Sequence, residues 1–311
     1  MSSPISKRVP DFIIIGAMKC MTSTLHEQLA RQPGIHMSSP KEPCYFSDDA
    51  IFARGPEWYA GLFSGCDAAD LCGESSTHYT KLPTYPQTVQ RLKAACPDVR
   101  LIYVMRHPID RLRSQYVHEW TQRIVNGPLD LAVITFPELV HYSRYSYQLA
   151  PYLATFGPRQ LLPVFFDRIA AQPQAELDTI CRFIGYPGRP QWRDDLGARN
   201  ASDQRMRSSR WRDRLVYAPG LSWVRRTLIS QSVRDRVKQF WQMSNKPQLS
   251  PARLAELTHL FDEDLRQLGD WLGAELTCDS FRQTTAENDL QWRDGLEDHF
   301  QASRGAREVT L

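Results

Sequence analysis

The sequence lacks a strong net charge, a long apolar run and any repeated or low-complexity segment. Its 311 residues carry a formal net charge of +3, far from the strongly basic character of a nucleic-acid-binding domain. No stretch approaches the roughly 20 apolar residues that cross a membrane, and the apolar run after the polar residues 1–10 is too short for a signal-peptide core. We therefore expect a soluble, cytoplasmic protein with no nucleic-acid partner and no membrane span.

Closely paired cysteines are also absent. The seven cysteines are dispersed and contain no C-x-x-C motif. This pattern favours reduced thiols in a cytoplasm over a disulfide framework or a zinc site, so we expect no metal. Cys20 falls in the loop discussed next, a position that favours a low thiol pKa. No histidine near it in the sequence supports a nucleophilic role.

Residues 11–29, D-F-I-I-I-G-A-M-K-C-M-T-S-T-L-H-E-Q-L, combine a strand, a turn and a helix start. The β-branched apolar run predicts a strand that turns at Gly16. Lys19 and three consecutive hydroxyl residues follow: Thr22, Ser23 and Thr24. Free backbone N–H groups and the positive end of the helix dipole at such a site favour a phosphate-like anion. The alternative is a capped helix that binds nothing.

Strands and helices alternate up to about residue 188, and a helical character follows. Apolar segments predict strands at 12–15, 70–74, 100–105 and 161–166, and helical patterns cover 58–63, 89–96, 109–120, 145–156, 175–184 and 254–272. This order indicates an α/β fold with a P-loop-like parallel sheet flanked by helices in three layers, and a helical C-terminal elaboration.

A second anion site is predicted where the strand at 100–105 ends. Arg106 follows that strand and Ser114 lies in the next helix, so a guanidinium and a hydroxyl can share one phosphate. Ligands of open α/β sheets gather at the carboxyl ends of the strands, where the first loop also lies. Two anion sites on one edge suggest a single ligand with two separated anionic groups.

Glu42 is a candidate general base. It stands with Lys41 between two prolines, Pro40 and Pro43, which predicts extended backbone for the pair. A carboxylate on a rigid segment close after an anion loop can take a proton from a substrate. The alternative is a surface Lys–Glu pair without a catalytic role.

An arginine-rich stretch at 205–226 contains Trp211 and Trp223. Such a run forms either solvated basic helices or a surface that binds an acceptor. The sequence leaves both readings open.

A nucleotide hydrolase or kinase is one alternative for the loop. Its pattern is G-x-x-x-x-G-K-[ST], whereas Lys19 follows Gly16 by three residues and no second glycine is present. Asp167, at the end of the apolar run L-P-V-F-F-D, could mimic a magnesium-positioning aspartate, but the partner motif is missing.

Four ordered segments, G-A-M-K-C-M-T-S-T-L, K-E-P-C-Y-F, G-E-S-S-T-H-Y and Y-V-M-R-H-P-I-D-R-L-R-S-Q-Y, resemble the sulfotransferase family. The similarity is to the branch shared by heparan-sulfate-type and soluble bacterial enzymes. It extends over residues 9–271, where F-D-E-D-L-R-Q-L-G-D-W-L is similar to the closing helix. The resemblance implies 3′-phosphoadenosine-5′-phosphosulfate (PAPS) as donor, the 3′,5′-bisphosphate (PAP) as product, no metal, and a carbohydrate or small natural-product acceptor that offers a hydroxyl or an amine.

The resemblance also implies residue roles. Lys19 would stabilise the transferring group and Glu42 would act as base. The 5′-phosphosulfate would be held by Lys19, Cys20, Met21, Thr22, Ser23 and Thr24. The 3′-phosphate would be held by Arg106 and Ser114, and a donor-closing loop would contribute Arg199, Asn200 and Arg205. One domain would cover residues 9–282, with a donor-binding core at 9–188, an acceptor-side elaboration at 189–282 and a polar, partly disordered tail at 283–311.

Two positions depart from the family pattern. Met21 stands where relatives commonly have glycine, at a cost if the backbone needs a positive φ. Cys44 stands where they commonly have histidine. His78 and His107 are therefore alternative bases, and a non-catalytic protein that binds PAP or PAPS is a rival reading. The sequence does not indicate an oligomeric state.

Overall fold

The computed structural model describes residues 8–196 and 247–300, in which strands form a single parallel sheet of order β2-β3-β1-β4-β5. The strands are β1 Phe12–Gly16, β2 Ile35–Met37, β3 Leu71–Ser75, β4 Arg100–Met105 and β5 Leu161–Phe165. In the central register Ile14 of β1 pairs with Ser75 of β3 and with Ile102 of β4. The predicted α/β fold is confirmed. Strand β2 was not predicted, because its three residues are too few to show a period-2 pattern.

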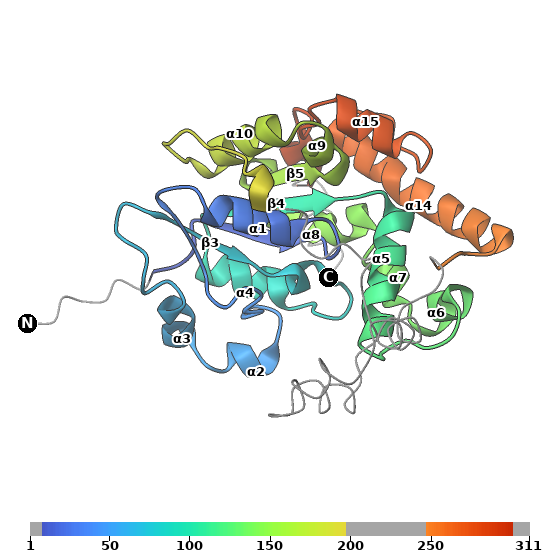
Figure 1. Ribbon diagram of the computed structural model, residues 1–311, viewed down its shortest axis with the longest axis horizontal. Helices are drawn as coiled ribbons and strands as arrows, with labels where there is room; N and C mark the ends of the chain where they lie inside the picture. The colour runs from blue at the N-terminus through green and yellow to red at the C-terminus, as the bar shows by residue number, and fades with distance from the viewer. Residues whose placement is uncertain (1–7, 197–246, 301–311) are drawn as a thin grey trace, which may run out of the picture.

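Helices connect the strands and cover both faces of the sheet (Figure 1). They are α1 Thr22–Ala30, α2 Asp49–Phe52, α3 Pro56–Gly61, η1 Thr77–Thr80, α4 Thr88–Ala95, α5 Pro108–Thr121, α6 Leu129–Thr135, α7 Glu138–His141, α8 Tyr145–Phe156, η2 Pro158–Gln160, α9 Phe166–Ala171, α10 Pro173–Ile184, η3 Asp194–Leu196, α14 Pro251–Leu272 and α15 Phe281–Glu287. No helix among the described residues is both long and apolar enough to span a membrane.

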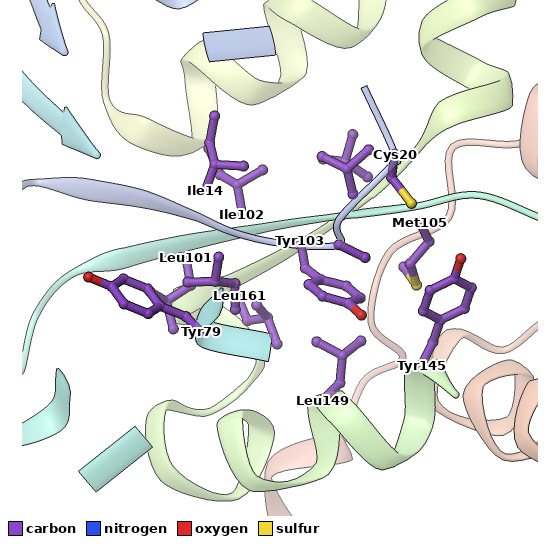
Figure 2. Close-up of a cluster of buried hydrophobic side chains, with 14 of the residues drawn as sticks. Ile14, Cys20, Tyr79, Leu101, Ile102, Tyr103, Met105, Tyr145, Leu149 and Leu161 are labelled. Atoms are coloured by element: carbon purple, nitrogen blue, oxygen red, sulfur yellow. The ribbon is translucent and has the colours of Figure 1, made fainter. Parts of the chain in front are cut away.

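The central strands are buried on both faces, which explains their continuous apolar sequences. Figure 2 shows Ile102 of β4 pointing to one side of the sheet, while Leu101 and Tyr103 point to the other. On that second side lies α8, with Tyr145 and Leu149 directed at the sheet. All five side chains are fully buried.

The chain beyond residue 282 is packed against the domain as far as Phe300. The indole nitrogen of Trp292 donates to the carbonyl oxygen of Leu161 at 2.5 Å. Leu296 is buried, and the ring of Phe300 lies 5.3 Å from that of Trp271. Residues 283–300 of the predicted tail are therefore ordered, because apolar side chains spaced along this polar stretch pack on the core.

Two buried glutamines, Gln28 in α1 and Gln32 just after it, bind the chain that follows α10. The side-chain amide of Gln28 donates to the carbonyl oxygen of Arg193 at 2.8 Å and accepts from its backbone nitrogen at 2.9 Å. Gln32 makes the same pair of bonds with Gln191, at 3.0 and 2.9 Å. These amides satisfy the backbone of 191–193 as a neighbouring strand would.

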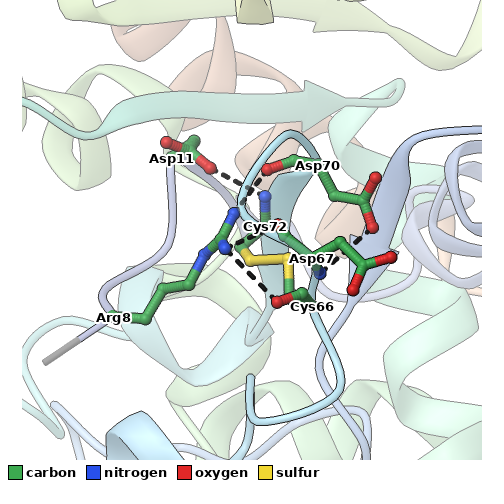
Figure 3. The surroundings of a disulfide bond; sticks show 6 residues. All are labelled: Arg8, Asp11, Cys66, Asp67, Asp70 and Cys72. Atoms are coloured by element: carbon green, nitrogen blue, oxygen red, sulfur yellow. Dashed lines mark hydrogen bonds between the residues drawn. A yellow bond between two sulfur atoms is a disulfide. The ribbon is translucent and has the colours of Figure 1, made fainter. Parts of the chain in front are cut away.

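One pair of cysteines is oxidised, which contradicts the expectation of reduced thiols throughout. Cys66 and Cys72 form a disulfide with their Cα atoms 6.6 Å apart, and Arg8 donates to carbonyl oxygens of the loop between them (Figure 3). The chain turns back between these two cysteines. They can therefore bond although they are six positions apart and form no C-x-x-C motif. The other five cysteines are free and buried.

Candidate active site

The predicted anion loop leaves the sheet at Gly16, where only glycine fits. A Cβ atom on Gly16 would lie 2.0 Å from the hydroxyl oxygen of Thr80 and 2.9 Å from the ring of Tyr103. The Thr80 hydroxyl instead donates to the carbonyl oxygen of Ile15 at 2.8 Å. This contact packs η1 against the end of β1 and brings the G-E-S-S-T-H-Y segment beside the loop.

The loop reaches α1 through two residues in the left-handed region. Lys19 has φ 74° and Met21 has φ 67°. Met21 therefore has the conformation in which a side chain carries a cost, about 1 kcal/mol relative to glycine. The first turn of α1 contains no acidic residue, and no side chain of the described residues caps it. Its N–H groups thus point at the space in front of the loop, which favours an anion.

Side chains of the loop are partly withdrawn from solvent. Thr22 and Thr24 are buried, while Lys19 and Ser23 are half-buried. The Cys20 thiol is fully buried, and this burial raises its pKa to about 11 despite the nearby Arg111, Arg106 and Lys19. The expected low pKa of Cys20 is therefore wrong, because loss of hydration outweighs the positive charges.

Glu42 lies at the same edge of the sheet, held by the chain beyond β3. Its backbone nitrogen donates to the carbonyl oxygen of Ser75 at 2.9 Å. Its Oε2 atom accepts from the backbone nitrogen of Thr77 at 2.7 Å and from the Thr77 hydroxyl at 3.2 Å. Its Oε1 atom lies 2.6 Å from Lys41 Nζ. Glu42 therefore forms the ion pair with Lys41 and is also a carboxylate held in a fixed position.

The backbone of Glu42 is not extended, contrary to the rule for a residue before proline. Its φ is 58°, in the left-handed region. The hydrogen bonds to Ser75 and Thr77 hold this conformation. Tertiary contacts thus override the local preference set by Pro43.

The alternative bases have different surroundings. His78 stacks on Tyr85 with ring centroids 5.2 Å apart, and burial, followed by the charge of Lys81, lowers its pKa to about 4. His107 Nε2 lies 2.9 Å from the carbonyl oxygen of Cys278, so this ring joins the start of α5 to the chain before α15.

His26 was not predicted as part of the site. It is buried on α1 with Nδ1 2.9 Å from the hydroxyl of Ser75. Burial, then the charge of Lys41, lowers its pKa to about 4. A single histidine in an amphipathic helix gives no sequence signal of this placement.

Arg106 occupies the predicted second anion site at the end of β4. The hydroxyl of Tyr145 bonds to both its backbone nitrogen and its carbonyl oxygen. Its guanidinium lies 4.6 Å from the centre of the Phe166 ring, and its Nε atom is buried with no hydrogen-bond partner among the described residues. Ser114 is half-buried on α5, the helix that begins two residues after Arg106. Arg199, Asn200, Arg205 and the whole arginine-rich stretch at 205–226 lie outside the described residues.

Asp167, the residue that could mimic a magnesium-positioning aspartate, lies in α9 beside positive charges. Burial raises its pKa, and Arg282 and Arg106 oppose that effect. Among residues 8–196 and 247–300, no three His, Cys, Asp or Glu side chains gather closely enough to hold a metal ion.

The fold and this edge define a parallel α/β protein, with the predicted anion loop at the carboxyl ends of its strands. A model described as the sulfotransferase family matches residues 57–191. The crystal structure of a sulfotransferase from Alicyclobacillus acidocaldarius superimposes with a TM-score of 0.62 at 22% identity, covering 89% of this chain and 99% of that one.

Curated proteins give matches of the same kind. The chain is 34% identical over 138 residues to the membrane-associated sulfotransferase kil1 of Dictyostelium discoideum, covering 43% of this chain and 28% of kil1. It is 27% identical over 196 residues to heparan sulfate glucosamine 3-O-sulfotransferase 6 of Mus musculus, covering 59% of this chain and 54% of that protein. The chain thus spans between about a quarter and about a half of these relatives. The resemblance to sulfotransferases found in its motifs is thus confirmed, since the family model and these relatives match the chain over part of its length.

Proposed function

We propose that the chain is an enzyme that transfers the sulfuryl group of PAPS to a hydroxyl of its acceptor and releases PAP. The observation that supports the proposal is one sheet edge that has both a loop with uncapped helix N–H groups and a fixed carboxylate. The loop follows β1, and Glu42 is bound to Thr77 just beyond β3. These two strands are hydrogen-bonded neighbours, since Ile14 pairs with Ser75.

The donor has two anionic groups, and the edge offers two places for them. The backbone N–H groups and hydroxyls at the start of α1, with Lys19, would hold the 5′-phosphosulfate. Arg106 and Ser114 would hold the 3′-phosphate, because the Nε of Arg106 has no partner within the described ranges and can donate to an oxyanion. β4 lies next to β1 in the sheet, so one nucleotide could reach both places.

The transfer would be an in-line displacement at sulfur. The acceptor oxygen bonds to sulfur as the bond from sulfur to the bridging oxygen breaks, and PAP leaves with the electron pair. Glu42 would take the proton of the attacking hydroxyl. Lys19 and the loop N–H groups would balance the negative charge that grows on the bridging oxygen. Fixed positive groups thus take the part that magnesium has in phosphoryl transfer.

The proposed acceptor is a carbohydrate or a small natural product with a free hydroxyl, or an amine. Support comes from the curated relatives whose names include heparan sulfate.

We propose the cytoplasm as the location of the protein, from the composition of its sequence. The Cys66–Cys72 disulfide favours an oxidising compartment instead, because disulfides are rare in the cytoplasm.

Calorimetry with PAP, followed by a transfer assay with sulfur-labelled PAPS and a panel of saccharides and alcohols, tests the proposal. We expect PAP binding without magnesium, and transfer that falls by about 10²–10³-fold in Lys19→Ala, which loses one preorganised positive donor. Lys93→Ala is the control, because its ammonium is exposed on α4 and donates to the carbonyl of Pro97. Binding without transfer to any acceptor would favour the non-catalytic rival. Magnesium-dependent ATP binding without PAP binding would refute the proposal.

A further inference from the structure

Arg111, on α5, is a fully buried arginine beside the anion loop. Its guanidinium donates four hydrogen bonds, all to uncharged acceptors: the Ser143 hydroxyl at 2.7 Å, the Gln115 amide oxygen at 2.6 Å, and the carbonyl oxygens of Leu139 at 3.0 Å and Met18 at 3.4 Å. Its relative exposure is 0%. No carboxylate of residues 8–196 or 247–300 forms an ion pair with it.

A buried charge without an opposite charge is unfavourable, because the hydration lost on burial is not replaced. Burial accordingly lowers the pKa of Arg111. The carboxylate that the hydrogen bonds reach is Glu119, through Gln115, whose amide nitrogen donates to Glu119 Oε1 at 3.5 Å. Lys81 exerts a stronger charge effect than Arg111 on the pKa of Glu119. Glu119 is thus shared with Lys81, and within the described part of the chain Arg111 has no carboxylate of its own.

The charge of Arg111 acts on the anion loop. Met18, whose carbonyl oxygen it contacts, lies between Gly16 and Lys19 in that loop. Among the charged groups that lower the pKa of the Cys20 thiol, Arg111 has the largest effect. The guanidinium is therefore close behind the backbone that would face the donor.

We propose that Arg111 is a positioning residue and the buried counter-charge of the 5′-phosphosulfate group. Its contacts with Met18, Ser143 and Leu139 fix the loop to α5, to α7 and to the residues before α8. Its positive charge acquires an opposite charge when the anionic group of the donor occupies the loop. This inference rests on the proposed function and deepens it, because it assigns part of the donor affinity to a side chain that solvent does not reach.

Calorimetric titration of PAP into Arg111→Gln and Arg111→Lys tests the inference. Both variants lose the planar fork, so we expect similar falls in the melting temperature of the free protein. Only the lysine variant keeps the charge. We expect PAP affinity to fall at least tenfold in Arg111→Gln and about threefold or less in Arg111→Lys, with the KM for PAPS rising in parallel and the KM for the acceptor unchanged. Arg100→Gln, at the opposite end of β4, is the matched control and should bind PAP as the wild type does.

Three results would overturn the inference while leaving the proposed function intact. Wild-type PAP affinity in folded Arg111→Gln would exclude any role in donor binding, and equal losses in the two variants would exclude the charge. If neither variant folds, Ser143→Ala removes one acceptor of the guanidinium and keeps the charge. We then expect three- to tenfold weaker PAP binding, and unchanged affinity would count against the positioning role. Failure of the wild type to bind PAP would instead overturn the proposed function.

Discussion

The carboxylate of Glu42 accepts two hydrogen bonds from Thr77, one from the backbone nitrogen at 2.7 Å and one from the hydroxyl at 3.2 Å. Both bonds reach Oε2, which leaves Oε1 to Lys41. A glutamine at position 42 could keep its carbonyl oxygen on Thr77 and lose only the ability to take a proton. We expect Glu42→Gln to slow transfer by about 10²–10⁴-fold with PAP affinity nearly unchanged. Wild-type turnover in this variant would show that Glu42 is not the base and would leave His78 and His107 as the alternatives.

Arg106→Ala should weaken donor binding far more than it slows the bound donor's reaction. The guanidinium lies on the ring of Phe166. None of the described residues forms a hydrogen bond with its Nε atom, so this atom can donate to a ligand. Removing one charge-assisted contact with a phosphate costs about 1.5–3 kcal/mol of binding, or roughly 10–100-fold in PAP affinity. Calorimetry measures this loss, and Arg91→Ala, which removes an ion pair with Asp49, is the control. Unchanged affinity in Arg106→Ala would remove this residue from the 3′-phosphate site.

A β-branched substitution should destabilise the protein more at position 21 than at position 18 of the same loop. At φ 67° a β-branched side chain clashes with the backbone, so Met21→Ile should destabilise the protein by about 1–2 kcal/mol and weaken PAP binding. Met21→Gly should bind PAP at least as well as the wild type. Met18→Ile is the control, because the φ of Met18 is not positive. Thermal unfolding and PAP titration measure both effects, and equal behaviour of the two isoleucine variants would contradict the assignment.

Glu74 should make the protein less stable as the pH rises toward neutrality. It is fully buried in β3, accepts a hydrogen bond from Tyr59, and burial raises its pKa from 4.5 to about 7. Between these two pH values the unfolded chain loses a proton that the native protein keeps, so the free energy of unfolding falls with pH. Glu74→Gln stays neutral and should exceed the wild type by about 2–3 kcal/mol at pH 8, with a difference that shrinks toward pH 4.5. Denaturant unfolding at several pH values measures the difference, and one independent of pH would refute the assignment.

The Cys66–Cys72 bond predicts a count of reactive thiols. Denatured protein alkylated without reductant should show five free thiols, since five cysteines are unpaired, and after reduction the count should be seven. Cys66→Ser should leave Cys72 as an additional thiol. A count of seven without reductant would show that the pair is reduced.

Local patterns predicted most of the sheet and the loop, because strands buried on both faces and a glycine-to-helix turn have short-range signatures. The helix at 145–156 was predicted with the bounds that the structure shows. The conformation of Glu42 was missed because hydrogen bonds from distant residues decide it. Arg111 was missed because its four-residue spacing to Gln115 and Glu119 is typical of a solvated helix face. Only the packing of α7 and of the anion loop against this face shows that it is buried.

The pairing of Gln28 and Gln32 with residues 191–193 limits how the protein can be shortened. A chain cut at the predicted core boundary, residue 188, would leave the amides of two buried glutamines without their partners. Each unsatisfied amide costs about 1–3 kcal/mol, which is a large share of the stability of an ordinary domain. The smallest fragment that folds should therefore extend past residue 193.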